Sequence, residues 1–268
     1  MILDVLGRPA YAYHGGKAFD ASLPCVVFVH GAQNDHSVWI LQSRYLAHHG
    51  YGVLAVDLPG HGRSGGAPLT SVGAMADWLA ALLDAAGVKR AAIVGHSMGS
   101  LIALDFAGRF SERARAIALV GAAYPMKVSE ALLDAARTDE ARAFDMINSW
   151  SHLSLNHQPG CPGPGFSVFV QARRLMERQP KGVLHVDFTA CNAYADGLER
   201  AAAVQCPALF VLGRRDMMTP PKAGRALASA IKSAQVVDVE SSGHSLMTEQ
   251  PDAVLRALTA FLETHGNA

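Results

Sequence analysis

One serine in this chain lies in a sequence context that can turn its hydroxyl into a nucleophile. Gly95-His-Ser97-Met-Gly99 fits the G-x-S-x-G pattern, with an apolar run before it and helix-forming residues directly after it. A strand–turn–helix context of this kind makes the pattern a nucleophile elbow. The sharp turn strains the backbone at the serine, and glycine at positions 95 and 99 permits the close packing that it requires. The turn also aims the first N–H groups of the helix at whatever Ser97 attacks.

A second copy of the pattern, Gly62-Arg-Ser64-Gly-Gly66, is interpreted as a glycine-rich loop. No strand pattern enters it, and no helix pattern follows it directly. For Ser97 the alternative to a nucleophile is a serine that only caps its helix. The choice depends on whether the chain also offers a base and an acid.

A serine hydroxyl near neutral pH needs a base within hydrogen-bond reach, and the base needs a third group that fixes its tautomer. In an open parallel sheet such groups lie in loops at the carboxyl ends of strands. Of the 12 histidines, His244 follows the last predicted strand and is the predicted base, the alternative being a solvated loop histidine. His30 is expected to shape a tight turn, His61 lies in a glycine loop, and His96 lies beside the serine rather than across from it.

The third group is predicted to be Asp216, which follows the apolar run Ala208–Leu212 through Gly-Arg-Arg. Asp238 lies inside the last predicted strand, and Asp57 ends a strand but is followed by a turn sequence, so both are weaker candidates. The resulting chain order is serine, acid, histidine.

An attacked carbonyl becomes an oxyanion, which needs preorganised N–H donors. The backbone N–H of Met98, next to the nucleophile, is one predicted donor. The loop after the first central strand is expected to give the other, and Ala32 is the candidate there, with Gln33 as the second choice.

Short apolar runs that alternate with helical patterns position these residues. Continuous apolar runs are typical of strands buried on both faces, and their alternation with helices predicts an α/β fold with a mostly parallel sheet covered on both faces. An antiparallel hairpin of residues 3–5 and 11–14 is predicted to come first. The runs predicted as parallel strands are Cys25–Val29, Gly52–Val56, Ala91–Val94, Ala116–Val120, Ala208–Leu212 and Ala234–Val239.

The alternation is interrupted in residues 124–203, where helical patterns and loops replace it. We interpret this segment as a helical insertion over the carboxyl edge of the sheet. The predicted domains are therefore a core of residues 1–123 and 204–268 and an inserted segment of residues 124–203, called the cap below because the family resemblance that follows implies a cap or lid at this place. The cap segments expected as helices are 131–143, 167–178 and 186–194.

In combination these motifs resemble the α/β-hydrolase fold, over most of the chain and in the order that this family has. The resemblance implies a central sheet of about eight strands, a lid or cap after the sixth, and an esterase-like serine hydrolase. Haloalkane dehalogenases and epoxide hydrolases carry aspartate at the position of Ser97, which argues against both. The matching pieces are His30-Gly-Ala32, Asp57-Leu-Pro-Gly-His-Gly-Arg-Ser64, Gly95-His-Ser-Met-Gly99, Gly213-Arg-Arg-Asp216 with Pro220, and Ser242-Gly-His244 with Glu249-Gln-Pro251.

The predicted reaction is hydrolysis of a carboxylic ester or related acyl bond through an acyl-Ser97 intermediate, without a cofactor. A C–C bond hydrolase or lyase could use the same triad, but relatives of that kind often have tryptophan after the base, where this chain has Ser245. A cofactor-free perhydrolase shares the triad and stays open. A binding protein on a hydrolase scaffold would have no need of all three residues together.

The predicted substrate is a small to medium, largely apolar and uncharged molecule held between the triad loops and the cap. Methionines and aromatic residues make an adaptable apolar wall of this kind. The alternative is that the cap residues only pack the cap onto the sheet. The residues predicted to line the pocket, besides Met98, are Met126, Met146, Trp150, Phe166, Met217 and Met218.

Composition narrows the class of partner. The chain of 268 residues has 23 basic and 23 acidic residues and no basic stripe, so no nucleic-acid partner is expected. No signal peptide, membrane-spanning run or phosphate-binding loop is recognised. The four cysteines are widely spaced without a C-x-x-C pair, so no metal site is predicted and a reducing cytoplasm is expected. The oligomeric state is left open between monomer and homodimer.

Overall fold

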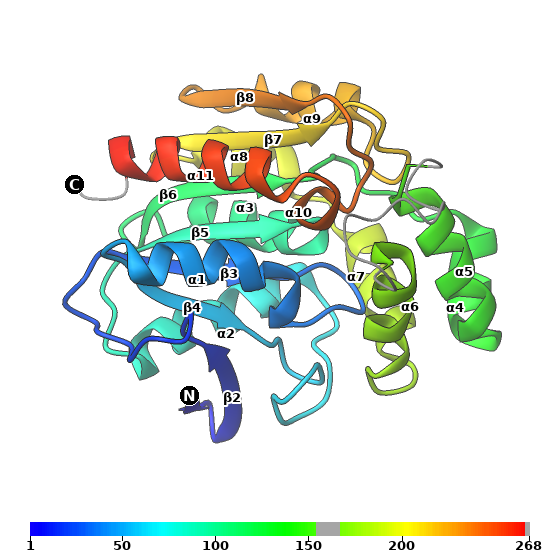
Figure 1. Cartoon of the computed structure of the whole chain (residues 1–268), viewed down its shortest axis with the longest axis horizontal. Coiled ribbons are helices and arrows are strands. Elements are labelled where there is room, and N and C mark those ends of the chain that lie inside the picture. The colour runs from blue at the N-terminus through cyan, green and yellow to red at the C-terminus, as the bar shows by residue number, and fades with distance from the viewer. Residues whose placement is uncertain (154–166, 266–268) are drawn as a thin grey trace.

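An eight-stranded sheet forms the centre of the computed structural model, which describes residues 1–153 and 167–265 (Figure 1). Its strands are β1 (Ile2–Val5), β2 (Arg8–Tyr13), β3 (Cys25–Val29), β4 (Gly52–Val56), β5 (Ala91–His96), β6 (Ala114–Val120), β7 (Ala208–Gly213) and β8 (Ala234–Val239). Their order in the sheet is β1-β2-β4-β3-β5-β6-β7-β8. The pairs β1–β2 and β2–β4 are antiparallel and all the others are parallel. The predicted mostly parallel sheet of about eight strands is confirmed.

The chain begins with the predicted antiparallel hairpin. β1 and β2 pair from Ile2 opposite Tyr11 to Val5 opposite Arg8. The two residues between them, Leu6 and Gly7, both have positive φ, as in the tight hairpin turn whose twist matches that of the strands. The second strand begins earlier than the predicted residue 11, because Arg8 and Pro9 already belong to β2.

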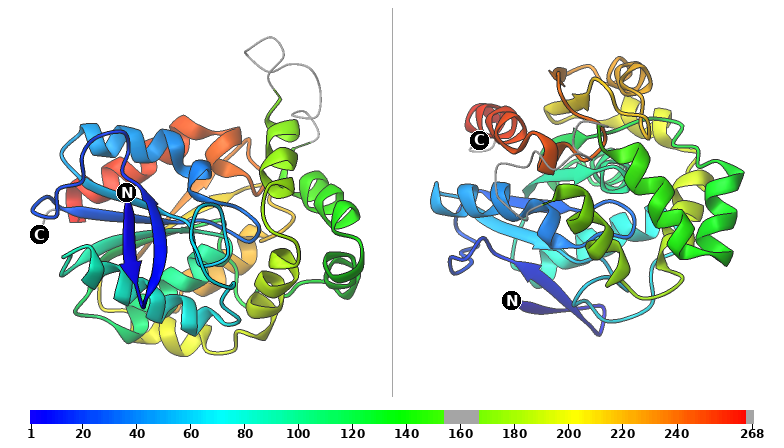
Figure 2. Two further views of the ribbon diagram at one scale, coloured as in Figure 1. Left: turned by 90° about the horizontal axis from the view of Figure 1, so that it is seen from below. Right: turned by 45° about the vertical axis from the view of Figure 1, so that its right-hand side comes forward.

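Helices cover both faces of the sheet (Figure 2, left). Side chains alternate between the faces, so Val26 and Phe28 of β3 pack on one side and Val27 and Val29 on the other. This double burial explains the uninterrupted apolar runs of the central strands. One face is covered by α1 (Ile40–His48) and α11 (Pro251–His265), and the other by α2 (Val72–Ala85), α3 (Met98–Arg109), α8 (Gly197–Ala203) and α9 (Pro221–Ala228).

Four further helices stand together beyond the carboxyl ends of the parallel strands (Figures 1 and 2). They are α4 (Glu130–Thr138), α5 (Glu140–Ser151), α6 (Val168–Glu177) and α7 (Val183–Ala193). They share an apolar cluster of their own, made of Leu132, Ala135, Ala136, Ala143, Phe144, Met176, Leu184 and Phe188. As expected, the described part of residues 124–203 contains no strand.

The helix expected at 131–143 is in fact two helices. Asp139 ends α4 and caps α5, since its carboxylate accepts a hydrogen bond from the N–H of Arg142. The last helix of the segment, α8, packs against the core helix α3. A Cβ atom at Gly108 would lie 2.8 Å from the Arg200 carbonyl oxygen, so this packing brings the two backbones close together.

None of the helices in the described ranges combines the length and apolarity needed to cross a bilayer. Two short elements complete the fold near the carboxyl ends of the strands. They are the 3-10 helix η1 (His36–Trp39) and the single turn α10 (Leu246–Glu249).

Candidate active site

Ser97 occupies the turn between β5 and α3. Its φ of 52° and ψ of −118° lie in the positive-φ region that side chains rarely adopt. A Cβ atom at Gly95 would collide with the backbone of Gly99, and one at Gly99 with the carbonyl oxygen of Val29. The two glycines therefore let strand, turn and helix pack closely enough to hold Ser97 in this conformation. The structure has the strand–turn–helix context that the sequence predicts here.

The hydroxyl of Ser64 is used within its loop. Ser64 Oγ donates to the carbonyl oxygen of Asp57 at 2.6 Å and accepts from the N–H of Tyr11 at 2.8 Å. These bonds tie the glycine-rich loop to the start of the sheet. The loop interpretation of this second serine motif agrees with these contacts.

His244 and Asp216 form a buried hydrogen-bonded pair. His244 Nδ1 lies 2.8 Å from Asp216 Oδ2, and the Thr219 hydroxyl lies 3.1 Å from the same nitrogen. The Asp216 carboxylate also accepts from the N–H groups of Met218 and Thr219, at 2.8 and 2.7 Å. Burial alone would raise the pKa of Asp216, but His244 and Thr219 hold this pKa below its ordinary value. Asp216 is therefore an anion that orients the His244 ring with Nδ1–H toward itself.

The three residues Ser97, Asp216 and His244 follow β5, β7 and β8, all at the carboxyl edge of the sheet. Ser97 and His244 line one cavity. No hydrogen bond joins Ser97 Oγ to His244 among the described residues, and in unliganded enzymes such catalytic contacts are often long.

His96 supports the His244 loop from beneath. Its Nε2–H donates to the His244 carbonyl oxygen at 2.9 Å, and the two rings lie 4.7 Å apart. Burial, assisted by the neighbouring His244, lowers the pKa of His96 to about 3. His96 is thus a neutral structural group beside the serine.

Two backbone N–H groups next to Ser97 have no acceptor in the described part of the chain, those of Met98 and Ala32. The N–H of Gln33, the second choice for the oxyanion site, instead donates to Asp187 Oδ2 at 2.9 Å. A Cβ atom at Gly31 would lie 3.1 Å from Ser97 Cβ, so the backbone at Gly31 passes close to Ser97. The geometry therefore favours Ala32 over Gln33 as an oxyanion donor.

The other acids have different roles. Asp57 Oδ1 accepts from the N–H of His36 at 2.7 Å, and Oδ2 accepts from the N–H of Arg63 at 2.9 Å, which agrees with a turn-shaping residue. Asp238 forms an ion pair with Arg225 on α9. Neither carboxylate contacts His244 in the described structure.

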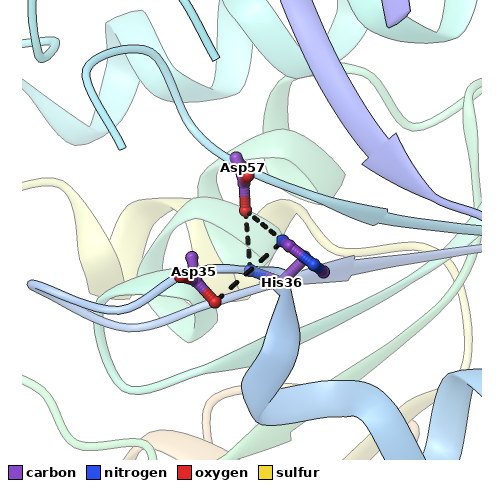
Figure 3. Close-up of side chains that lie close together, drawn as sticks. All are labelled: Asp35, His36 and Asp57. Atoms are coloured by element: carbon purple, nitrogen blue, oxygen red, sulfur yellow. Dashed lines mark hydrogen bonds and ion pairs between the residues drawn. The ribbon is translucent and has the colours of Figure 1, made fainter. Parts of the chain in front are cut away.

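A cluster of Asp35, His36 and Asp57 has the ligand spacing of a metal site (Figure 3). Its oxygen atoms are, however, already held by hydrogen-bond donors. Asp35 accepts from Ser37 at 2.6 Å and from Arg178 at 2.7 Å, and these donors outweigh burial and hold the pKa of Asp35 at about 2. The cluster is a network that joins the loop after β3 to Arg178 at the end of α6.

The candidate site opens into a narrow cavity of about 60 Å³. Its wall combines apolar side chains from α5, α6 and α7 with neutral polar groups and the residues already described. No charged side chain other than histidine belongs to the described lining. The lining residues are Ala32, Asn34, His96, Ser97, Ile147, Asn148, Ser151, His152, Ala172, Met176, Phe188, Met218, His244 and Ser245.

The pocket prediction needs correction, because among its described residues only Met218 lines this cavity. Met217 points into solvent and is 69% exposed, and Met126 is buried in the sheet core. Met146 and Trp150 pack against the apolar cluster shared by α4–α7 instead. Met98, named with them, is fully buried. Phe166 lies outside the described residues.

The face of α5 explains this difference. Ile147, Asn148 and Ser151 follow helical spacing on the side that meets the cavity, whereas Met146 and Trp150 lie on the neighbouring side. The sequence of α5 shows the helical period, but which side of the helix meets the cavity depends on how α5 packs against the rest of the protein. The Ser151 carbonyl oxygen accepts from the N–H groups of His244 and Ser245, at 2.8 and 3.0 Å, which fixes that docking.

Comparison with known proteins identifies the family. Residues 26–257 match the alpha/beta hydrolase family, and the chain belongs to this family. A pimeloyl-[acyl-carrier protein] methyl ester esterase of Chromobacterium violaceum is 30% identical over 250 residues, covering 90% of this chain and 95% of that protein.

Solved structures agree with this assignment. The enol-lactonase of Burkholderia xenovorans LB400 is 26% identical with a TM-score of 0.85, covering 98% of this chain and 100% of that one. An esterase of Thermogutta terrifontis shares the fold at 22% identity, with a TM-score of 0.85 over 100% of this chain and 99% of that one. The family match and these relatives identify the protein as an esterase-like enzyme of the α/β-hydrolase fold.

Proposed function

We propose that the enzyme hydrolyses a carboxylic ester through an acyl-Ser97 intermediate, with His244 as base and Asp216 as the group that orients it. The observation that carries this proposal is that Ser97, His244 and Ala32 line one cavity, with Asp216 hydrogen-bonded to His244 and with no acceptor for the N–H groups of Ala32 and Met98 in the described structure. These are the parts that acyl transfer to serine requires.

The proposed steps follow from the hydrogen bonds. Because Nδ1–H of His244 is held by Asp216, Nε2 is left to accept the Ser97 proton as Oγ attacks the ester carbonyl carbon. The carbonyl oxygen becomes an oxyanion, which the N–H groups of Ala32 and Met98 stabilise. Collapse breaks the bond to the alcohol, which leaves with the proton from His244. Water then attacks the acyl-serine by the same route and releases the acid.

The proposed substrate is a small, uncharged ester or lactone. The narrow cavity and the absence of charged side chains from its described lining, histidine aside, support this class. The relatives named above act on a methyl ester and on an enol-lactone by their names, which is the same range of chemistry. The helices α4–α7 serve in this proposal as the cap that delimits the pocket, with the remaining helices and the sheet as the core.

Asn148 indicates that the substrate also carries a hydrogen-bond donor. Its Nδ2 donates to the Phe169 carbonyl oxygen at 2.9 Å, and its Oδ1 is buried without a partner among the described residues. A buried acceptor without a partner is costly, and a donor on the substrate would satisfy it. We therefore assign to the substrate a hydroxyl or amide N–H group near the reacting ester.

A cytoplasmic location also belongs to the proposal. Cys25, Cys191 and Cys206 are buried free thiols, which suits a reducing compartment.

A chain-length series of p-nitrophenyl esters, from acetate to palmitate, tests the substrate class. We expect kcat/KM to peak at short or medium acyl chains, because the cavity is narrow. The Ser97→Ala enzyme gives the background rate, and a vinylogous diketone tests C–C cleavage in parallel. A preference for emulsified long-chain lipid, for a charged CoA thioester or for the diketone would contradict the proposed substrate class.

A further inference from the structure

A buried histidine–aspartate pair joins the glycine-rich loop after β4 to α7. His61 Nε2 lies 2.9 Å from Asp187 Oδ2, and both side chains are almost fully buried, at 1% and 0% exposed. His61 belongs to the glycine-rich loop after β4, whereas Asp187 lies on α7. None of the steps described above uses either residue.

The contacts of His61 indicate its protonation state. Its second ring nitrogen, Nδ1, faces the Pro59 carbonyl oxygen at 3.1 Å. Both ring nitrogens therefore face oxygen acceptors, and only the doubly protonated ring can donate to both. Burial would lower the pKa of His61, but the Asp187 carboxylate raises this pKa above its ordinary value. The pair is thus an imidazolium facing a carboxylate inside the protein.

Asp187 also holds the loop after β3, which carries the proposed oxyanion donor Ala32. The same oxygen, Oδ2, accepts from the N–H of Gln33, 154 residues away, at 2.9 Å. Gln33 has a φ of 57°, a conformation that costs energy in a residue other than glycine and needs such an anchor.

A second anchor lies on the other side of Ala32. Nδ1–H of His30 donates to the Gly31 carbonyl oxygen at 2.8 Å. That carbonyl and the Ala32 N–H share one peptide plane, and the Gln33 N–H belongs to the next. His30 and Asp187 therefore fix the two consecutive peptides that meet at Ala32. The rings of His30 and His61 lie 4.8 Å apart, which connects the two anchors.

We propose that Asp187, held by protonated His61, is a positioning residue through which α7 of the cap completes the oxyanion hole. The Ala32 N–H points correctly only while α7 lies on the loop, so cap docking and transition-state stabilisation are coupled. This inference rests on the proposed function of the site.

Asp187→Ala removes the anchor, whereas Asp187→Asn keeps an oxygen that can accept from the Gln33 N–H. Loss of one oxyanion donor costs about 10²–10³ in kcat, and a misdirected donor costs less. We expect Asp187→Ala to lower kcat by roughly 10–100-fold with KM changed less than about threefold, and Asp187→Asn to recover part of that loss. Affinity for a trifluoromethyl ketone, whose serine adduct carries an oxyanion, should fall by the same factor as kcat/KM.

Asp105→Asn is the matched control. Asp105 is an equally buried carboxylate on α3 that binds Arg109, Arg200 and Tyr194, away from the cavity lining. It should lower stability and leave kcat unchanged. If Asp187→Ala does not fold, the Asp187→Asn enzyme alone gives the readout.

Two results would overturn the inference. One is a rise in KM with kcat unchanged in the folded Asp187 variants, and the other is an unchanged affinity for the ketone. A wild-type enzyme that neither hydrolyses esters nor binds the ketone would instead contradict the proposed function, and the inference with it.

Discussion

The residues around Ser97 differ in charge because their surroundings differ. Asp216 is kept anionic by donors from Thr219, Met218 and His244. His96, in contact with His244, is kept neutral by burial. One ring can therefore act as a base next to a second ring that only supports the backbone. In this account, the division of labour between the two histidines follows from hydrogen bonding and burial rather than from residue type.

Replacement of Asp216, the proposed orienting acid, tests the role of a single carboxylate. Asp216→Asn should fold normally and lower kcat by roughly 10³–10⁴-fold, since an amide favours the wrong tautomer of the base. Steady-state kinetics with a short aryl ester measure the effect.

Asp238→Asn serves as the comparison, because Asp238 pairs with Arg225 and does not contact His244 in the described structure. It should change kcat far less. Near-wild-type turnover in a folded Asp216→Asn enzyme would show that the orienting acid is a different residue.

Sequence patterns predicted those features of the strands and turns that depend on local chemistry. The apolar runs of β3 to β7 and the glycines of the turn at Ser97 follow from the local requirements of buried strands and of a tight turn. The rule that functional loops follow parallel strands then placed Asp216 and His244 correctly at the carboxyl edge of the sheet.

Contacts between distant elements could not be read from sequence. The bond from Gln33 to Asp187 spans 154 residues and depends on where α7 docks. The same holds for α5, whose docked face offers Ile147 and Asn148 rather than Met146 and Trp150 to the cavity. A helical period identifies the faces of a helix, but packing selects among them.

Two histidines, His30 and His96, are buried in the folded protein and are neutral there. Burial is the main cause that lowers the pKa of His30 to about 4 and that of His96 to about 3, both below the value of 6.5 expected in the unfolded chain. Between pH 6.5 and about 4 the unfolded chain therefore binds more protons than the folded one, so stability falls as pH falls. His61 has the opposite effect on the pH dependence of stability. Its pKa is raised in the folded protein, so the stability that protonated His61 contributes is lost as pH rises.

Urea unfolding at about pH 7, 6 and 5 measures this effect. The free energy of unfolding should fall as pH falls, with each of the two histidines contributing up to about 1.4 kcal/mol per pH unit within this window. Replacement of the exposed His48 by glutamine is the control and should leave the slope unchanged. Stability that is constant or increases from pH 7 to about pH 5 would contradict neutral burial of His30 and His96.

Labelling with a fluorophosphonate, read by peptide mass spectrometry, tests the central claim most directly. The reagent forms a covalent bond only with a serine whose hydroxyl is activated by a base. We predict one label per chain, on Ser97, in the wild-type and Ser64→Ala proteins, and none in folded Ser97→Ala. A label on Ser64 or on any other residue in place of Ser97, or a folded wild-type protein that takes up no label, would contradict the assignment of Ser97 as the activated nucleophile.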